Sequence, residues 1–243
     1  MAITVQNWFS SWFDTPYYHI LYKDRDYQEA QLFMKNLTTF LNLKSGARIL
    51  DLACGKGRHS IYLNHLGYDV TGVDLSSKSI EYAQQYENES LHFKVQCMCK
   101  PLPEQFDAVF NLFTSFGYFE RDEDNFRTIA SIKEELSVDG FGVIDFMNVN
   151  KVISNLVPQE IKTVKGIEFH ISRTEKNGYI LKNIQFEDKG TFYNFTERVK
   201  SLTLEDFKEY FSRAGIKIRR IFGNYKLEDF IETSSDRLIL VFQ

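Results

Sequence analysis

The chain has 243 residues, of which 43% are hydrophobic and 26% charged, so it can bury one substantial α/β core with an accessory piece, and disorder is excluded. Its net charge of −4 gives no electrostatic footprint for duplex nucleic acid. No run of about eighteen apolar residues predicts a membrane span. The N-terminus lacks a secretory signal, and the three cysteines, an odd number, suit a reducing compartment, so we expect a cytoplasmic protein.

The first predicted elements are helical. Within residues 5–22, tryptophan and phenylalanine recur at i, i+4, which predicts a short helix with one aromatic side that is broken by Pro16. Such a segment can pack against the core, or it can lie as a lid across the strand ends where a ligand binds. A longer amphipathic helix is predicted over residues 26–43. Its expected apolar side comprises Leu32, Phe33, Leu37, Phe40 and Leu41.

A strand, a glycine turn and a helix follow. Residues 47–53 are mostly apolar, which is typical of a buried strand, and apolar residues recur at helical spacing after residue 60. Between them, Gly55 and Gly57 lack a Cβ, so the backbone can bend sharply and approach a ligand. A second strand ends at Asp74, roughly twenty residues further on, the spacing of a ribose-binding carboxylate in a doubly wound sheet. Together these features predict a nucleoside cofactor.

Asp51 discriminates between nucleoside cofactors. The glycines alone leave NAD possible, because Ser60 occupies the third small position of a dinucleotide fingerprint. An acid in the turn, however, would repel a pyrophosphate and suits a ligand that carries an ammonium group. The stretches 50–57 and 72–76 resemble the first and second motifs of the class I S-adenosylmethionine (SAM) dependent methyltransferases.

This resemblance implies SAM as the cofactor. Asp51 and the turn would hold its methionine part, and Asp74 its ribose. Residues 13–25 are similar to an N-terminal cap in which a tyrosine and a basic residue reach the cofactor. The cofactor-binding candidates are Asp51, Ala53, Cys54, Gly55, Gly57, Asp74, Leu75, Cys97, Met98, Asn111, Phe113, Tyr18 and Arg25.

The adenine segment departs from the family pattern. After a third predicted strand, residues 91–96, the family commonly has an acid and then a hydrophobic residue at the adenine, and here Cys97 replaces the acid. Met98 can still lie against the ring. A metal-binding pair formed by Cys97 and Cys99 is the other interpretation, although the spacing of a four-ligand site is missing.

The fourth predicted strand, residues 106–113, leads into a loop at the ligand crevice. Residues 111–118 resemble the fourth motif of the same methyltransferases, which lies beneath the methyl donor and beside the acceptor. The loop lacks the Asn/Asp-Pro-Pro-Tyr/Phe sequence and the Pro-Cys nucleophile that act on nucleobases. Phe116, Tyr118 and Tyr17 are candidates for lining the substrate pocket, with core packing as the alternative. A helix over residues 122–136 and a fifth strand over 140–147 follow.

Residues 151–199 change to period-two alternation. Turns at Asn177–Gly178 and 188–190 predict a three-stranded antiparallel meander. A Thr203-x-x-Asp206 capping box then begins a helix that ends at Gly215, and residues 216–222 and 237–242 supply two last strands.

The expected fold is a Rossmann-like, doubly wound, seven-stranded and mostly parallel sheet with an antiparallel β insertion. The expected domains are a helical cap at 1–46, a SAM-binding domain at 47–150 and 201–243, and an insertion at 151–200 that covers the acceptor pocket.

The expected activity is methyl transfer from SAM by direct in-line displacement to a small-molecule acceptor, without a metal. The alternatives are a non-catalytic SAM- or nucleoside-binding protein and a SAM-dependent enzyme with other chemistry. If a general base is needed, the candidates are Tyr17, His19, Tyr118 and His170.

Overall fold

The computed structural model describes residues 12–23 and 27–243, and the chain divides into two compact units. Among the described residues, the larger unit comprises 27–151 and 202–243, and the smaller one comprises 12–23 and 152–201. No helix in the described part of the chain has the length and apolar character needed to cross a bilayer.

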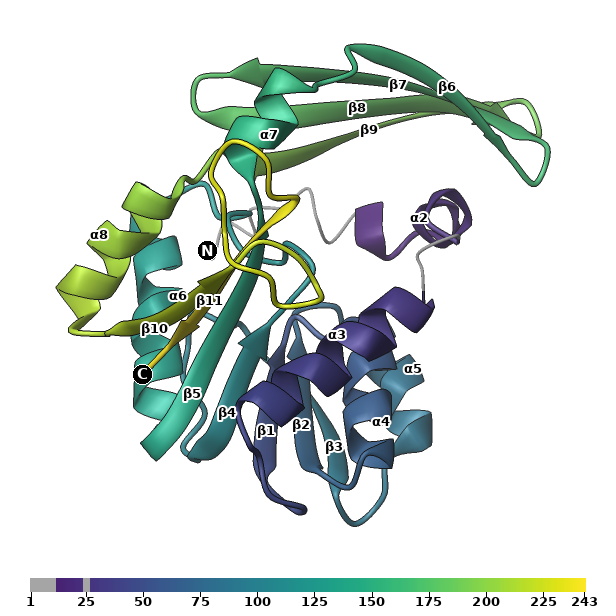
Figure 1. Cartoon of the computed structure of the whole chain (residues 1–243). Helices are drawn as coiled ribbons and strands as arrows, with labels where there is room; N and C mark the ends of the chain where they lie inside the picture. Colours follow the sequence, from purple (N-terminus) through teal and green to yellow (C-terminus); the bar gives the residue numbers. More distant parts are fainter. Residues whose placement is uncertain (1–11, 24–26) are drawn as a thin grey trace, which may run out of the picture. The chain divides into compact units, whose positions relative to one another are not determined.

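The larger unit contains a seven-stranded sheet with the order β10-β11-β5-β4-β1-β2-β3 (Figure 1). β11 runs antiparallel to both of its neighbours, and the other pairings are parallel. The predicted Rossmann-like sheet is therefore confirmed. Its strands are β1 (Arg48–Leu52), β2 (Asp69–Asp74), β3 (Leu91–Val95), β4 (Phe106–Asn111), β5 (Leu136–Met147), β10 (Ile218–Phe222) and β11 (Arg237–Phe242).

Helices cover both faces of this sheet. α3 (Tyr27–Phe40), α4 (Arg58–His65) and α5 (Ser77–Ala83), which continues into the short η1 (Gln84–Tyr86), lie on one face. α6 (Asp122–Glu135) and α8 (Leu204–Ala214) pack together on the other (Figure 1). α7 (Val149–Ser154) follows β5. The predicted caps are confirmed, because the Ser76 hydroxyl accepts from the Ser79 amide and Thr203 forms a capping box with Asp206.

The buried side of α3 is rotated from the predicted one. Its inward side chains are Ala30, Phe33, Met34, Leu37 and Thr38. Leu32 and Phe40 are each 44% exposed, so their assignment to the apolar side was wrong. The two residues lie eight positions apart on a neighbouring stripe of the helix, and Ala30 and Met34 take the positions that face the sheet.

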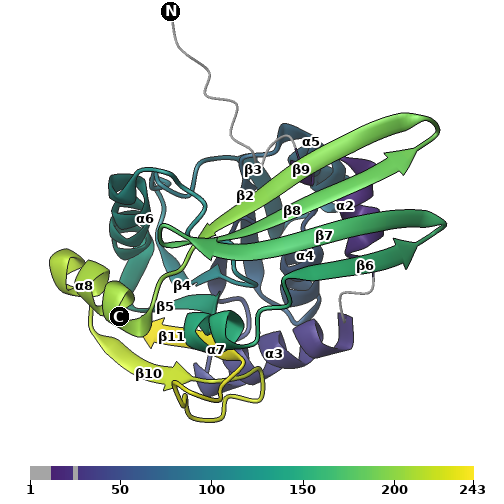
Figure 2. The same ribbon diagram turned by 90° about the horizontal axis from the view of Figure 1, so that it is seen from above.

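The smaller unit contains a four-stranded antiparallel sheet in sequential order (Figure 2). Its strands are β6 (Gln159–Val164), β7 (Ile167–Lys176), β8 (Tyr179–Asp188) and β9 (Thr191–Lys200). The prediction of three strands missed β6. Its turn, Lys165–Gly166, has φ values of 50° and 80°, close to the 54° and 75° of the predicted turn Asn177–Gly178. Lysine rarely adopts this conformation, so the sequence signal for the extra hairpin is weak.

The described part of the N-terminal segment belongs to the smaller unit. Helical residues 12–13 end in a turn and a bend at 14–15, so the predicted interruption at Pro16 is confirmed. Pro16 itself begins a new helix, α2 (Pro16–Leu21), which Thr15 caps and whose first turn suits proline. Trp12 is fully buried, and its Nε1 donates to Glu197 Oε1 at 2.7 Å. α2 therefore groups with the four-stranded sheet and α3 with the seven-stranded sheet, whereas the sequence had placed both in one cap.

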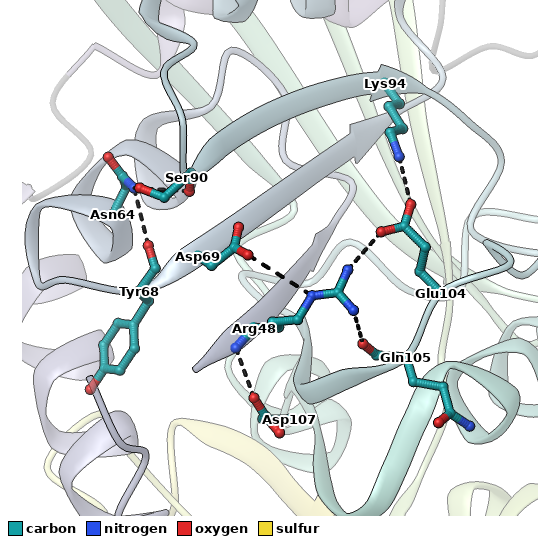
Figure 3. Close-up of polar contacts among 9 residues, drawn as sticks. All are labelled: Arg48, Asn64, Tyr68, Asp69, Ser90, Lys94, Glu104, Gln105 and Asp107. Atoms are coloured by element: carbon teal, nitrogen blue, oxygen red, sulfur yellow. Dashed lines mark hydrogen bonds and ion pairs between the residues drawn. The ribbon is translucent and has the colours of Figure 1, made fainter. Parts of the chain in front are cut away.

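Charged side chains link the start of β1 to the segment before β4 and, through Lys94, to β3 (Figure 3). Arg48 donates to Glu104 at 2.6 Å and to the carbonyl of Gln105 at 2.8 Å, and its backbone amide donates to Asp107 at 2.8 Å. Lys94 donates to the other oxygen of Glu104 at 2.7 Å. The bonds from Lys94 and Arg48 lower the pKa of Glu104, so the side chains around Arg48, at the amino edge of the sheet where β1 begins, form an exposed network of paired charges.

Candidate functional site

The turn after β1 places three residues in the left-handed region: Ala53, Gly55 and Gly57 have φ values of 60°, 56° and 77°. A Cβ on Gly57 would lie 2.5 Å from the ring of Phe93, so this glycine permits close packing of α4 on the sheet. A Cβ on Gly55 would meet nothing within 4 Å. Gly55 therefore presents bare backbone to open space, as a close approach of a ligand requires.

Asp51, on β1, is a buried acid that forms no ion pair with the described residues. It is 3% exposed, and the Ser60 hydroxyl donates to its Oδ2 at 2.6 Å. Burial raises the pKa of Asp51 to about 7, and the charge of Asp74 adds to this effect, while the bond from Ser60 and the charge of Arg58 oppose it. A cationic group placed beside Asp51 would favour its ionised form.

Asp74, at the end of β2, connects that strand to the glycine turn. Its Oδ2 accepts from the Gly55 amide at 2.9 Å, and its Oδ1 accepts from the Ser76 amide at 2.8 Å. A carboxylate oxygen has two lone pairs and can accept more than one hydrogen bond. This arrangement suits a carboxylate that also binds two neighbouring hydroxyl groups.

Asn111, at the end of β4, carries an unpaired buried acceptor. Its side chain is fully buried, and its Nδ2 approaches the carbonyl of Leu52 at 3.3 Å and Met98 Sδ at 3.7 Å. Its Oδ1 has no hydrogen-bond partner among the described residues. Leaving such an atom unpaired costs roughly 1–3 kcal/mol, so Asn111 Oδ1 is a strong candidate to accept a bond from a ligand.

These four features test whether SAM fits the edge. The Asp51 carboxyl, which forms no ion pair among the described residues, and the unpaired Asn111 Oδ1 suit the ammonium group of the methionine part of SAM. Asp74 suits ribose hydroxyls, and the open space at Gly55 leaves room for the backbone to approach. These residues therefore fit SAM. The acids beside the turn, Asp51 and Asp74, would repel the negative charge of a pyrophosphate.

The segment after β3 contains the other predicted cofactor residues. Met98 is 9% exposed and lies against Asn111, whereas Leu75 is 41% exposed. Cys97 and Cys99 form a disulfide, so the expectation of reduced cysteines is not met here. A tight turn places their Cα atoms 5.2 Å apart, within the range that a disulfide bridges. Neither sulfur is then a thiolate that could hold a metal. Cys54 is a free buried thiol whose pKa is raised by burial.

The loop after β4 separates its aromatic residues. The half-buried Phe113 stacks on His59 with ring centroids 4.3 Å apart, while Tyr118 is partly exposed. Phe116 is fully buried and packs against Phe207 of α8, as the alternative of core packing expects.

The remaining candidates lie in the smaller unit. Tyr17 donates to Asp188 at 2.9 Å, and interactions with Tyr193 and Asp188 raise its pKa, which does not favour a role as a general base. Tyr18 packs against Trp12, and His19 is exposed. His170 is exposed, with its Nε2 at 2.8 Å from Glu168. Arg25 lies outside the described residues.

Sequence reasoning missed Asp145 on β5 and Arg237 on β11. Asp145 is fully buried, and Arg237 Nε donates to its Oδ1 at 2.8 Å. The available signal was an acid near the end of an apolar strand, the same pattern that identified Asp51 and Asp74.

Comparison with known proteins gives a consistent family. Residues 49–140, which include the glycine turn and β1 to β4, match the Methyltransferase domain family. The Bacillus subtilis protein YqeM, itself assigned as a methyltransferase, is 27% identical over 196 residues, covering 76% of this chain and 79% of YqeM.

Two further relatives are named as N-methyltransferases. A glycine/sarcosine N-methyltransferase of Aphanothece halophytica is 32% identical over 53% of this chain and 49% of its own length. A dTDP-3-amino-3,4,6-trideoxy-alpha-D-glucopyranose N,N-dimethyltransferase of Streptomyces venezuelae is 24% identical over 72% of this chain and 77% of its own.

The fold agrees with these relatives. The crystal structure of an S-adenosylmethionine-dependent methyltransferase from Clostridium acetobutylicum superposes with a TM-score of 0.78, at 18% identity over 93% of this chain and 95% of that one. The fold, the matched domain and the relatives agree with the glycine turn and its acidic neighbours, and together they support a class I SAM-dependent methyltransferase.

Proposed function

We propose that this enzyme binds SAM at the carboxyl edge of β1, β2 and β4 and transfers its methyl group to a small-molecule amine. The observation that carries the proposal is a pair of buried acceptors: the Asp51 carboxyl, which forms no ion pair among the described residues, and Asn111 Oδ1, which has no hydrogen-bond partner among them. The charge of Arg58 is the smallest of the influences on the pKa of Asp51. An ammonium group would satisfy both acceptors. The paired charges at the amino edge offer nothing comparable.

Each residue has a defined part in this proposal. SAM, when bound, supplies an electrophilic methyl group on a sulfonium sulfur. Asp51 and Asn111 orient the ammonium end, Asp74 orients the ribose, and Met98 lies against the adenine. Holding the donor and the acceptor atom at about 3 Å in a water-excluded site can lower the barrier by roughly 7–11 kcal/mol, so positioning alone provides much of the catalysis.

The amine acceptor is supported by the relatives, two of which are named for N-methylation of an amino acid or an amino sugar. Such an acceptor must present its nitrogen without the ammonium proton, because the lone pair forms the new bond to carbon. Tyr118, in the loop after β4, and Tyr17, His19 and His170, in the smaller unit, remain candidates for accepting that proton. The predicted cover of the acceptor pocket by the insertion also remains a proposal.

Two measurements test this function. Calorimetry should detect binding of SAM and S-adenosylhomocysteine and no binding of NAD. Methyl transfer from labelled SAM should then be detected with some members of a panel of glycine, sarcosine and amino sugars, and not with their hydroxyl or carboxylate analogues. Binding of NAD in preference to SAM would overturn the cofactor assignment, and transfer only to non-amine acceptors would overturn the acceptor class. The cytoplasmic location and the exclusion of duplex nucleic acid remain predictions from composition.

A further inference from the structure

A buried ion pair at the carboxyl edge has no part in the proposed chemistry. Asp145 is fully buried on β5, and Arg237, at the first position of β11, donates to it at 2.8 Å with its side chain 19% exposed. A buried ion pair is often no more stabilising than apolar residues of the same volume. Its remaining bonds therefore indicate what it does.

Those bonds go to the loop after β4. Asp145 Oδ2 accepts from the Phe113 amide at 2.7 Å, and the Asp145 carbonyl accepts from the Thr114 amide at 3.0 Å. Arg237 Nη2 donates to Thr114 Oγ1 at 2.8 Å. The ion pair thus binds one amide and one hydroxyl of a single short segment, and the backbone carbonyl of Asp145 binds the next amide.

That segment has a backbone conformation that needs support. Phe113 and Thr114 have φ values of 57° and 59°, so two successive residues other than glycine are left-handed. This conformation is unfavourable for both and most unusual for the β-branched Thr114. It persists only where the surrounding structure holds it.

The held segment adjoins the proposed cofactor site. Asn111, with its free Oδ1, lies two residues before Phe113, and the Phe113 ring stacks on His59 at the start of α4. Tyr225 adds a second support, because its hydroxyl reaches Asp145 Oδ2 at 3.3 Å and its ring centroid lies 5.5 Å from that of Phe113.

We propose that Asp145 and Arg237 are positioning residues that hold Phe113 and Thr114 in the left-handed conformation and thereby fix Asn111 and Phe113 at the SAM site. The positioning of SAM rests on the proposed function. The clamp, by which we mean the bonds from Asp145 and Arg237 that hold Phe113 and Thr114, does not rest on it, and its effect on the loop can be measured in the ligand-free protein.

The first test compares Arg237→Met with Arg48→Met, the same substitution at the opposite edge of the sheet. Hydrogen exchange at the Phe113 and Thr114 amides, measured by NMR, should become at least about tenfold faster in Arg237→Met and stay unchanged in Arg48→Met. Calorimetry should show SAM binding weakened about tenfold in Arg237→Met only. Unchanged exchange in folded Arg237→Met, or equal effects of both variants, would overturn the clamp.

The second test is a rescue. Glycine adopts a positive φ without strain, so Thr114→Gly combined with Arg237→Met should recover part of the lost SAM affinity, which a general loss of stability would not allow. If Arg237→Met does not fold, Arg237→Lys replaces it. Its ammonium keeps the charge beside Asp145 but lacks the guanidinium fork that also reaches Thr114, so we expect an intermediate increase in exchange. Wild-type exchange in Arg237→Lys, or no rescue by glycine, would count against the proposal.

The readouts separate the two proposals. Failure of the wild-type protein to bind SAM would overturn the proposed function and leave the exchange result valid. A wild-type protein that binds SAM, together with variants that bind it equally well, would overturn only the positioning role.

Discussion

Charged side chains are paired at the amino edge of the seven-stranded sheet, whereas a buried acid at its carboxyl edge is not. At the amino edge, Arg48 and Glu104 are partly exposed and paired, Glu104 also binds Lys94 of β3, and the pKa of Glu104 is lowered (Figure 3). At the carboxyl edge, Asp51 is buried and forms no ion pair among the described residues, and its pKa is raised. The first arrangement stabilises strand ends, whereas the second retains an unfavourable acid that a ligand can satisfy.

The same contrast applies to uncharged groups. At the amino edge, Asn64 Nδ2 donates to the carbonyls of Tyr68 and Ser90. At the carboxyl edge, Asn111 Oδ1 is buried and unpaired among the described residues. Among the same residues, Asn125 and Glu135 Oε2, in α6, are also buried and unpaired, but Asn111 Oδ1 lies among the family motifs, on the side expected for a ligand in a doubly wound sheet.

The largest expected effect is that of Asp51→Asn on SAM binding. Removing one partner of a buried charge pair typically costs 2–5 kcal/mol, so we expect about a 100-fold loss of affinity by calorimetry. The control is Glu135→Gln, because Glu135 is also buried with its pKa raised to about 7 but lies at the end of α6, where it accepts from the Leu102 amide. Equal SAM affinity in wild type and Asp51→Asn would remove the main support for the site.

Both variants should stabilise the ligand-free protein at high pH. Because the folded-state pKa is raised, the folded protein retains a proton that the unfolded chain releases, and the free energy of unfolding falls as the pH rises from about 4 to about 7. For Asp51 this loss is on the order of 4 kcal/mol. Thermal denaturation at pH 8 should therefore give a higher Tm for Asp51→Asn and Glu135→Gln, while only Asp51→Asn impairs SAM binding.

Gly55→Ala should test whether a ligand occupies the open space beside the turn at the carboxyl edge. Its methyl group would enter the open space beside the turn, and we expect about a 30-fold loss of SAM affinity, equivalent to roughly 2 kcal/mol. Gly46→Ala is the matched control, since Gly46 also has a positive φ, 77°, and open space around a Cβ, but precedes β1 at the amino edge. Both variants should lose about 1–2 kcal/mol of stability from backbone strain. Similar SAM affinities in the two would show that no ligand approaches Gly55.

The pH dependence of binding should follow the ionisation of Asp51. With its pKa at about 7 in the free protein, SAM affinity should rise about tenfold between pH 6 and pH 8, because the ammonium binds the ionised acid. The amino group of the ligand titrates as well, so the Asp51→Asn variant serves as the reference, and the difference between the two curves reports Asp51. Parallel curves would contradict this assignment.

Arg48→Met should have the smallest effect on function. The network at the amino edge is exposed, so its loss should lower the free energy of unfolding by about 1 kcal/mol without changing SAM affinity. Chemical denaturation and calorimetry would measure the two quantities. A change in SAM affinity in Arg48→Met would show that the amino edge affects the SAM site, and would contradict the separation of the two edges.

The sequence by itself determined the seven-stranded sheet and the acids at its strand ends. Apolar runs, the glycine spacing and the positions of Asp51 and Asp74 are local signals, because each reflects the conformation or burial of a few consecutive residues. The family match confirms the interpretation of these signals as methyltransferase motifs. The role of each residue in binding SAM stays a prediction.

Only the tertiary structure decided how these side chains are paired. Three features depend on contacts between segments far apart in the chain. Among the described residues, Asp51 forms no ion pair, Asn111 Oδ1 has no hydrogen-bond partner, and Phe116 packs against Phe207. Asp145 and Arg237 are 92 residues apart, and their pairing follows from the register of β5 and β11. Long-range packing sets burial and hydrogen bonding, and no local pattern in the sequence encodes either one.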